Sequence, residues 1–291
     1  MDTSELLKKV RKIEIKTRGL SKHIFSGEYH SAFKGRGMAF SEVREYQFGD
    51  DIRNIDWNVT ARFNHPYIKV FEEERELSVI LLVDISASGL FGTVSQFKKD
   101  LITEICAVLS FSALQNNDKI GLILFSDKIE KFIPLKKGRH HVLRIIRELL
   151  EFKPESNQTD LSVALRYLIN VIKKRGIVFI LSDFISKDFE EPLKIAAKKH
   201  DTIAINIFDQ RESELPNVGL IYAQDNETGD LVWIDTSSSE VREKHKQWWL
   251  NHQKRLDDTF NFNSVDSIRI RTDQSYVSPL INFFRQREKR K

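Results

Sequence analysis

The sequence predicts an α/β protein with a doubly wound, mainly parallel sheet and helices on both faces. Continuous apolar runs at 79–83, 119–125, 177–181 and 202–208 are typical of strands buried on both faces. Amphipathic or largely apolar segments of helical length separate these runs. Because such an alternation places crossover helices between parallel strands, it favours this architecture over an all-α or all-β fold.

The first part of the chain is less regular than the rest. Leucine, valine and isoleucine at helical spacing predict an amphipathic helix over 3–24. The segment 27–77 is rich in glycine, aspartate, arginine and aromatic residues, and 67–71 is its one predicted strand. We therefore expect 1–76 to be an N-terminal helix and turn/strand-rich elaboration packed on a main domain formed by 77–291.

The elements of the main domain are predicted from the spacing of apolar residues and from the proline and glycine residues that interrupt them. Pro134 marks 129–135 as an edge strand, because proline cannot donate to a central ladder. Asn226 to Gly229 is typical of a hairpin turn. The predicted helices are 95–116, 138–152, 161–174, 188–199, 239–260 and 276–287, and the further strands are 220–223, 231–234 and 267–271.

Composition excludes several classes of protein. A net charge of +4 on 291 residues is too small to imply nucleic-acid binding. The charged N-terminal stretch is unlike a signal peptide, and no apolar run reaches the length of a membrane span. The single cysteine, Cys106, lies in an apolar helical segment and is best read as a core residue. We expect a cytoplasmic protein without stable membrane insertion.

Oxygen-bearing side chains recur where predicted strands end and helices begin. Asp84, Ser86 and Ser88 follow the first buried strand, Thr159 begins a helix, and Asp183 follows another buried strand. In a parallel sheet these positions share one edge, where ligands bind. Such a set suits a hard cation, Mg²⁺ (or Mn²⁺), which would attract a carboxylate from a partner. The alternative is that these side chains only cap helices and form turns.

The irregular segment carries charges of alternating sign. It is either a salt-bridged, turn-rich segment or a recognition surface for a partner. The residues concerned are Glu42, Arg44, Asp50, Asp51, Arg53, Asp56 and Arg62.

The spacing of the oxygen ligands resembles the metal-ion-dependent adhesion site of von Willebrand factor A domains. Asp84, Ser86 and Ser88 match the D-x-S-x-S loop, Thr159 the threonine loop and Asp183 the third loop. The resemblance implies that these five residues bind the metal. The third loop departs from the pattern, because Phe184 stands where many members have glycine.

Longer blocks are similar to the bacterial domain-of-unknown-function family fifty-eight. They are FKGRGMAFSEVREYQFGDDIRNIDWNVTAR, VFEEERELSVILLVDISAS and NDKIGLILFS. This resemblance implies a non-enzymatic protein-binding module, an adaptor or co-chaperone that works with a MoxR-type AAA+ ATPase and its client proteins.

Two other functions stay open. Asp84 at a strand end could be the nucleophile of an aspartyl-phosphate-type phosphohydrolase, although Ser86 stands where such enzymes need a second acid. The basic stretch 285–291 could make the protein a metal-independent, membrane-associated scaffold.

Overall fold

The computed structural model describes residues 10–17, 39–72, 76–86, 97–156, 158–186, 188–224 and 231–290. The chain forms two compact units, one of 34–76 and one that combines 1–33 with 77–291. Residues 10–17 are helical, as predicted, and belong to the larger unit. The remainder of the helix predicted over 3–24 lies outside the described residues.

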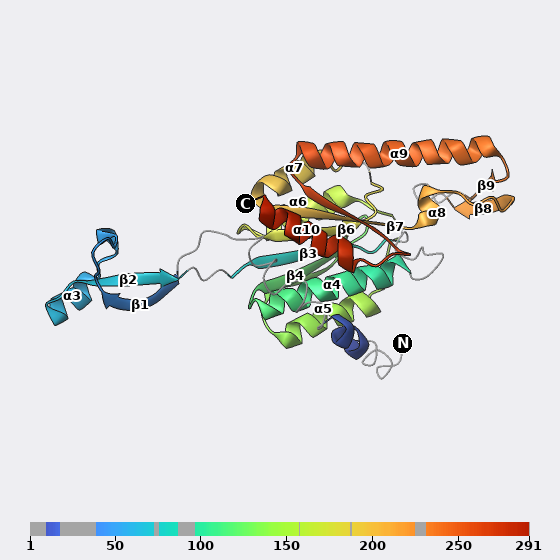
Figure 1. The fold of residues 1–291 in the computed structure, drawn as a ribbon. Coiled ribbons are helices and arrows are strands. Elements are labelled where there is room, and N and C mark those ends of the chain that lie inside the picture. The colour runs from blue at the N-terminus through green and yellow to red at the C-terminus, as the bar shows by residue number, and fades with distance from the viewer. Residues whose placement is uncertain are drawn as a thin grey trace. The chain divides into compact units, whose positions relative to one another are not determined.

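The larger unit is built on a six-stranded sheet with the order β10-β7-β6-β3-β4-β5 (Figure 1). All neighbouring strands are parallel except β4 and β5, which are antiparallel. β5 therefore lies at an edge, as Pro134 predicts. The strands are β3 (Ser78–Asp84), β4 (Lys119–Phe125), β5 (Ile129–Lys136), β6 (Ile177–Ser182), β7 (Asp201–Phe208) and β10 (Asp266–Arg271).

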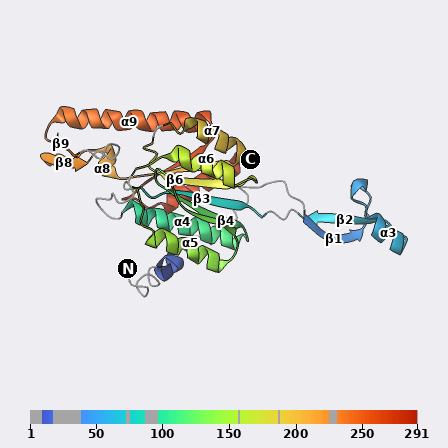
Figure 2. The same ribbon diagram turned by 180° about the vertical axis from the view of Figure 1, so that it is seen from behind.

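Helices cover both faces of this sheet (Figures 1 and 2). α4 (Lys98–Gln115), α5 (Arg139–Glu151) and α10 (Val277–Lys289) bury their apolar residues in one core cluster. α6 (Leu161–Val171), α7 (Glu190–Lys199) and α9 (Ser239–Phe262) contribute to the other. The predicted fold class is thus confirmed, and α8 (Gln210–Ser213) is a short helix that the sequence pattern did not indicate.

The central strand β3 explains why the sheet separates two cores. Val79, Leu81 and Val83 contribute to the α4 side, whereas Ile80 and Leu82 contribute to the α6 side. All five are at most 1% exposed. A strand with apolar side chains on both faces has to be central, and its parallel neighbours β4 and β6 keep it so.

Two smaller sheets complete the described structure. β8 (Leu220–Gln224) and β9 (Leu231–Asp235) pair antiparallel, as predicted, and their connecting turn lies outside the described residues. β1 (Ala39–Glu45) and β2 (Tyr67–Glu72) pair antiparallel within the smaller unit. β1 was not predicted from sequence. Its register shifts between Phe40 and Glu42, which breaks the two-residue alternation of a regular strand.

Candidate functional site

The site lies at the carboxyl ends of the neighbouring strands β3 and β6. Asp84 ends β3 and is 5% exposed. Its Oδ1 accepts a hydrogen bond from the backbone N–H of Ser86 at 3.0 Å, and its Oδ2 accepts one from the Ser182 hydroxyl at 2.7 Å. Because Ser182 is the last residue of β6, this bond ties the two strand ends together and points Asp84 toward the loop after β6.

Asp183, the residue after β6, is held from two sides. Its Oδ1 accepts the backbone N–H of Ile185 at 3.1 Å, and its Oδ2 lies 3.1 Å from Nζ of Lys98, the first residue of α4. The same ammonium lies 2.5 Å from Oε1 of Glu212 on α8. The Lys98 and Asp183 side chains are each 2% exposed, so this ion pair is shielded from solvent.

Thr159 belongs to the same edge of the sheet. The N–H of Asp160 donates to the carbonyl of Ser126 at 2.9 Å, directly after β4, and the N–H of Leu161 donates to Ser186 Oγ at 3.2 Å. These bonds tie the loop before α6 to the ends of β4 and β6. Asp160, and not Thr159, caps α6, so the alternative that Thr159 is an N-cap is wrong. The Thr159 hydroxyl therefore has no capping role.

The electrostatics of the site are dominated by buried negative charge. Burial, followed by the nearby charge of Asp183, raises the pKa of Asp84 to about 6. Burial also raises the pKa of Glu212 against the opposing pull of Lys98. For Lys98, burial favours the neutral amine, but Asp183 and Glu212 outweigh it and raise the pKa above its ordinary value. Lys98 thus faces two carboxylates of the described residues, Asp183 and Glu212.

The space beside Asp84 is small. A cavity of 30 Å³ is lined by Asp84 and Ser86 and otherwise mostly by apolar residues of β3, α4 and the end of α5. This volume is on the order of one water molecule or ion. Of the predicted metal ligands that the structure describes, Asp84 and Ser86 line this cavity and Asp183 and Thr159 do not.

Three of the five predicted metal ligands are brought together by the structure: Asp84, Ser86 and Asp183. Ser86 is 1% exposed, and Thr159 lies in the neighbouring loop. Ser88 falls outside the described residues. Lys98 and Glu212 were not among the site residues predicted from sequence. Lys98 precedes the apolar positions Leu101 and Ile102 by three and four residues, and this helical spacing could have placed it on the buried face.

The alternating charges of the smaller unit have local structural roles. Arg44 donates to both carboxylate oxygens of Asp50, at 2.8 and 2.9 Å. Asp51 caps a short 3-10 helix, η1 (Ile52–Asn54), and Asp56 caps α3 (Trp57–Phe63). Glu42, Arg53 and Arg62 are exposed. These residues thus form a salt-bridged, turn-rich segment, and their recognition role stays a prediction.

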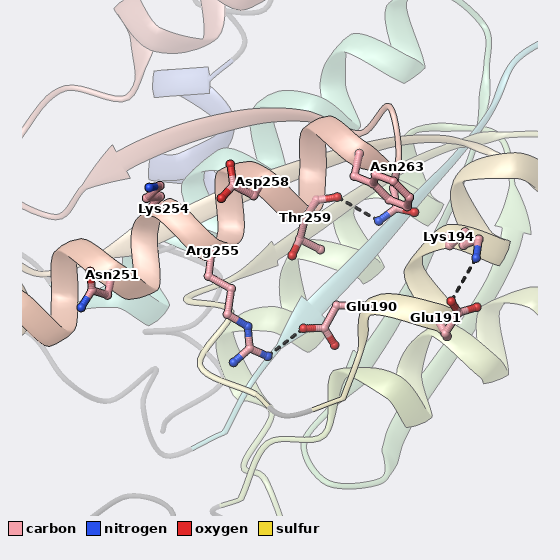
Figure 3. Close-up of a pocket in the computed structure, with 10 residues that line it drawn as sticks. Glu190, Glu191, Lys194, Asn251, Lys254, Arg255, Asp258, Thr259 and Asn263 are labelled. Carbon is pink, nitrogen blue, oxygen red and sulfur yellow. Dashed lines mark hydrogen bonds and ion pairs between the residues drawn. The ribbon is translucent and has the colours of Figure 1, made fainter.

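A groove of 520 Å³ between α7 and α9 is a second hollow on the larger unit (Figure 3). Arg255 of α9 donates to Glu190 of α7 at 2.7 Å, and Lys194 pairs with Glu191 along α7 at 3.0 Å. These are solvent-exposed pairs, which stabilise a fold little. Lys254 and Asp258 also line the groove.

The donor set at the strand ends fits a hard divalent cation. All its predicted ligands are oxygens, and two buried carboxylates lie within electrostatic reach of one another. The described residues contain no cluster of three or more His, Cys, Asp or Glu side chains arranged to bind a metal. A metal here would therefore have to use the hydroxyls of Ser86, Ser88 and Thr159 as well as Asp84 and Asp183.

Comparison with solved structures places the fold among known α/β proteins. An aerotolerance-related membrane protein from Bacteroides fragilis aligns with a TM-score of 0.50 and 13% identity, over 74% of this chain and 100% of that chain. The VWA domain of SpRpn10 aligns with a TM-score of 0.40 and 12% identity, over 72% of this chain and 95% of that chain. In the part of the chain that the structure describes, no helix is both long and apolar enough to cross a bilayer.

Sequence comparison gives the family. The uncharacterized protein Rv1480 of Mycobacterium tuberculosis is 29% identical over 292 residues, which cover 99% of this chain and 92% of the relative. The uncharacterized protein YeaD of Bacillus subtilis is 29% identical over 109 residues, 38% of this chain and 25% of the relative. The model of a protein of unknown function, DUF58, matches residues 42–255. The chain therefore belongs to the DUF58 family.

Proposed function

We propose that this protein is a non-enzymatic binding module that holds Mg²⁺ or Mn²⁺ at Asp84, Ser86, Ser88, Thr159 and Asp183 and recruits a carboxylate of a protein partner. The observation that carries the proposal is the buried pair Asp84 and Asp183 at adjacent strand ends. Lys98 neutralises Asp183, and a second carboxylate buried beside it is unfavourable unless a further cation compensates its charge. The metal would supply a positive centre for the carboxylate of the partner.

Binding of the ion itself is the first test. We expect Asp84→Asn to lower the affinity for Mg²⁺ and Mn²⁺ by about tenfold or more, as loss of a carboxylate near a metal commonly does. Isothermal titration calorimetry measures this directly. The matched control is Asp257→Asn, the same change at a half-exposed aspartate of α9 that pairs with Arg269. Equal affinity in wild type and Asp84→Asn would refute the metal site.

Partner binding is the second step of the same proposal. The candidate partner is a MoxR-type AAA+ ATPase, which the family resemblance names, with its client proteins as further ligands. We expect the purified ATPase to bind wild type with Mg²⁺, and to bind neither the chelated protein nor Ser86→Ala. Surface plasmon resonance would show this. Retention in all cases would move attention to the smaller unit, where Glu42, Arg53 and Arg62 are exposed.

An enzymatic function has less support. Ser86 stands where a phosphohydrolase with Asp84 as nucleophile needs an acid, and it is 1% exposed. The cavity beside Asp84 is also too small for a phosphate ester among the described residues.

A further inference from the structure

Lys98 is the buried cation of the site. Lysine is almost never fully buried unless it is paired. Its side chain is 2% exposed and its ammonium contacts Asp183 and Glu212 from two different elements. Removing this charge from water is costly, so its contact with Asp183, a predicted metal ligand, calls for a role.

Glu212 is built to hold this lysine. Its Oε2 accepts the backbone N–H of Asp209 at 2.9 Å in a capping box at the start of α8, which fixes the carboxylate. Its Oε1 is then directed at Nζ of Lys98 at 2.5 Å. The ammonium of Lys98 thus has two partners. The family resemblance assigns a metal-binding role to Asp183 and none to Glu212.

Among the groups of the site that the structure describes, carboxylates outnumber ammonium groups. Asp84, Asp183 and Glu212 carry three negative charges when ionised, and Lys98 carries one positive charge. The remaining charge of −2 matches a divalent ion. A divalent ion at Asp183 would repel the ammonium 3.1 Å from Oδ2, whereas Glu212 would still attract it.

We propose that Lys98 competes with the divalent cation for Asp183, and that Glu212 accepts its ammonium when the metal binds. This inference rests on the proposed metal site and adds its regulation. Lys98 keeps Asp183 neutralised while the site is empty, so the fold tolerates the metal-free state. It also weakens metal affinity, which makes occupancy responsive to the concentration of the ion.

The test is a double-mutant cycle on Mg²⁺ and Mn²⁺ affinity by calorimetry, with the full chain. We expect Lys98→Met to bind the ion about tenfold more tightly than wild type, which is a change of about 1.4 kcal/mol. Glu212→Gln should bind it more weakly, because the ammonium then rests on Asp183 alone. In the Lys98→Met background, Glu212→Gln should have little effect. Simple charge additivity instead predicts the same loss in both backgrounds.

Lys194→Met is the matched control. It removes the same charge on α7, where Nζ lies 3.0 Å from Oε1 of Glu191 in a solvent-exposed pair. Its affinity should stay near that of wild type. Circular dichroism establishes folding, and if Lys98→Met does not fold, unchanged affinity in Glu212→Gln would overturn the inference.

The outcomes separate the two proposals. If wild type binds the ion and Lys98→Met binds it no more tightly, the competition is overturned while the metal site stands. If no variant binds a divalent cation, the proposed function itself fails. Binding by Lys98→Met alone would support the competition but overturn the proposed function, because Lys98 would then replace the metal in the wild-type protein.

Discussion

Phe184 shows how a single residue adapts the site loop to this sequence. It follows Asp183 directly, has a φ of 58°, and is 0% exposed. A left-handed conformation costs a non-glycine residue roughly 1–2 kcal/mol. The phenylalanine ring offsets this by packing 5.1 Å from Phe260 and 6.2 Å from Phe189, between ring centroids. Phe184 in place of glycine in the third loop therefore costs backbone strain and gains packing of its ring in the core.

This exchange predicts an inverted order of stability for two variants. Phe184→Ala should lose about 3–5 kcal/mol of unfolding free energy, because it removes the ring and keeps the strained φ. Phe184→Gly should be about 1 kcal/mol more stable than Phe184→Ala, because glycine adopts positive φ freely. Urea denaturation measures both values.

Phe179 supplies the control for this prediction. It is 0% exposed and lies in the middle of the extended strand β6. There glycine should be less stable than alanine by roughly 0.5–1 kcal/mol, the ordinary order. If both sites gave the same order, the strain at Phe184 would not be the cause.

At the scale of elements, the close approach of β3 and β6 fixes the two strand ends of the site. Their register pairs Val79 with Ile177 and Val83 with Leu181. Gly176, just before β6, allows this approach, because a Cβ there would lie 2.6 Å from the carbonyl oxygen of Ser78. That oxygen belongs to the backbone of β3 and cannot move without disturbing the strand.

We therefore expect Gly176→Ala to destabilise the fold by about 1–3 kcal/mol through overpacking. The free energy of urea unfolding is the measurement. Lys174→Ala, an exposed change two residues earlier, should stay within about 0.5 kcal/mol of wild type. A neutral Gly176→Ala would show that β6 shifts easily along β3, and the placement of Asp183 would then be less fixed than the register suggests.

The larger elements could be predicted from sequence because their signals are local. The buried strands β3, β4, β6 and β7 are continuous apolar runs, and their helices have clear apolar faces. The bulged strand β1 and the four-residue helix α8 lack such periods, and only their pairing or capping partners define them. The same holds for the site. Asp84 and Asp183 follow from strand ends, whereas the contact of Lys98 with Glu212 joins residues 114 positions apart.

At the scale of the whole molecule, the two units differ in how many buried apolar side chains each contributes to a core of its own. In the larger unit, both clusters of buried apolar residues consist of its own side chains. The entry to β3 is also fixed within it, since the N–H of Leu77 donates to Asp118 Oδ1 at 2.9 Å. Among the residues of the smaller unit whose burial the structure describes, 42–69 and 76, Ile68 is the one buried apolar side chain. Units of this size rarely hold a stable core alone.

These differences predict that the larger unit folds without the smaller one. Replacing 34–76 by a flexible glycine–serine linker should leave a cooperative thermal transition within about 4 °C of wild type, which corresponds to roughly 1 kcal/mol. The isolated segment 34–76 should show no cooperative transition by circular dichroism. Because all five proposed metal ligands lie outside 34–76, the shortened chain should also bind Mg²⁺ with wild-type affinity. A large fall in melting temperature would instead mean that the core depends on the smaller unit. If the shortened chain binds Mg²⁺ normally but no longer binds the ATPase, partner recognition belongs to 34–76.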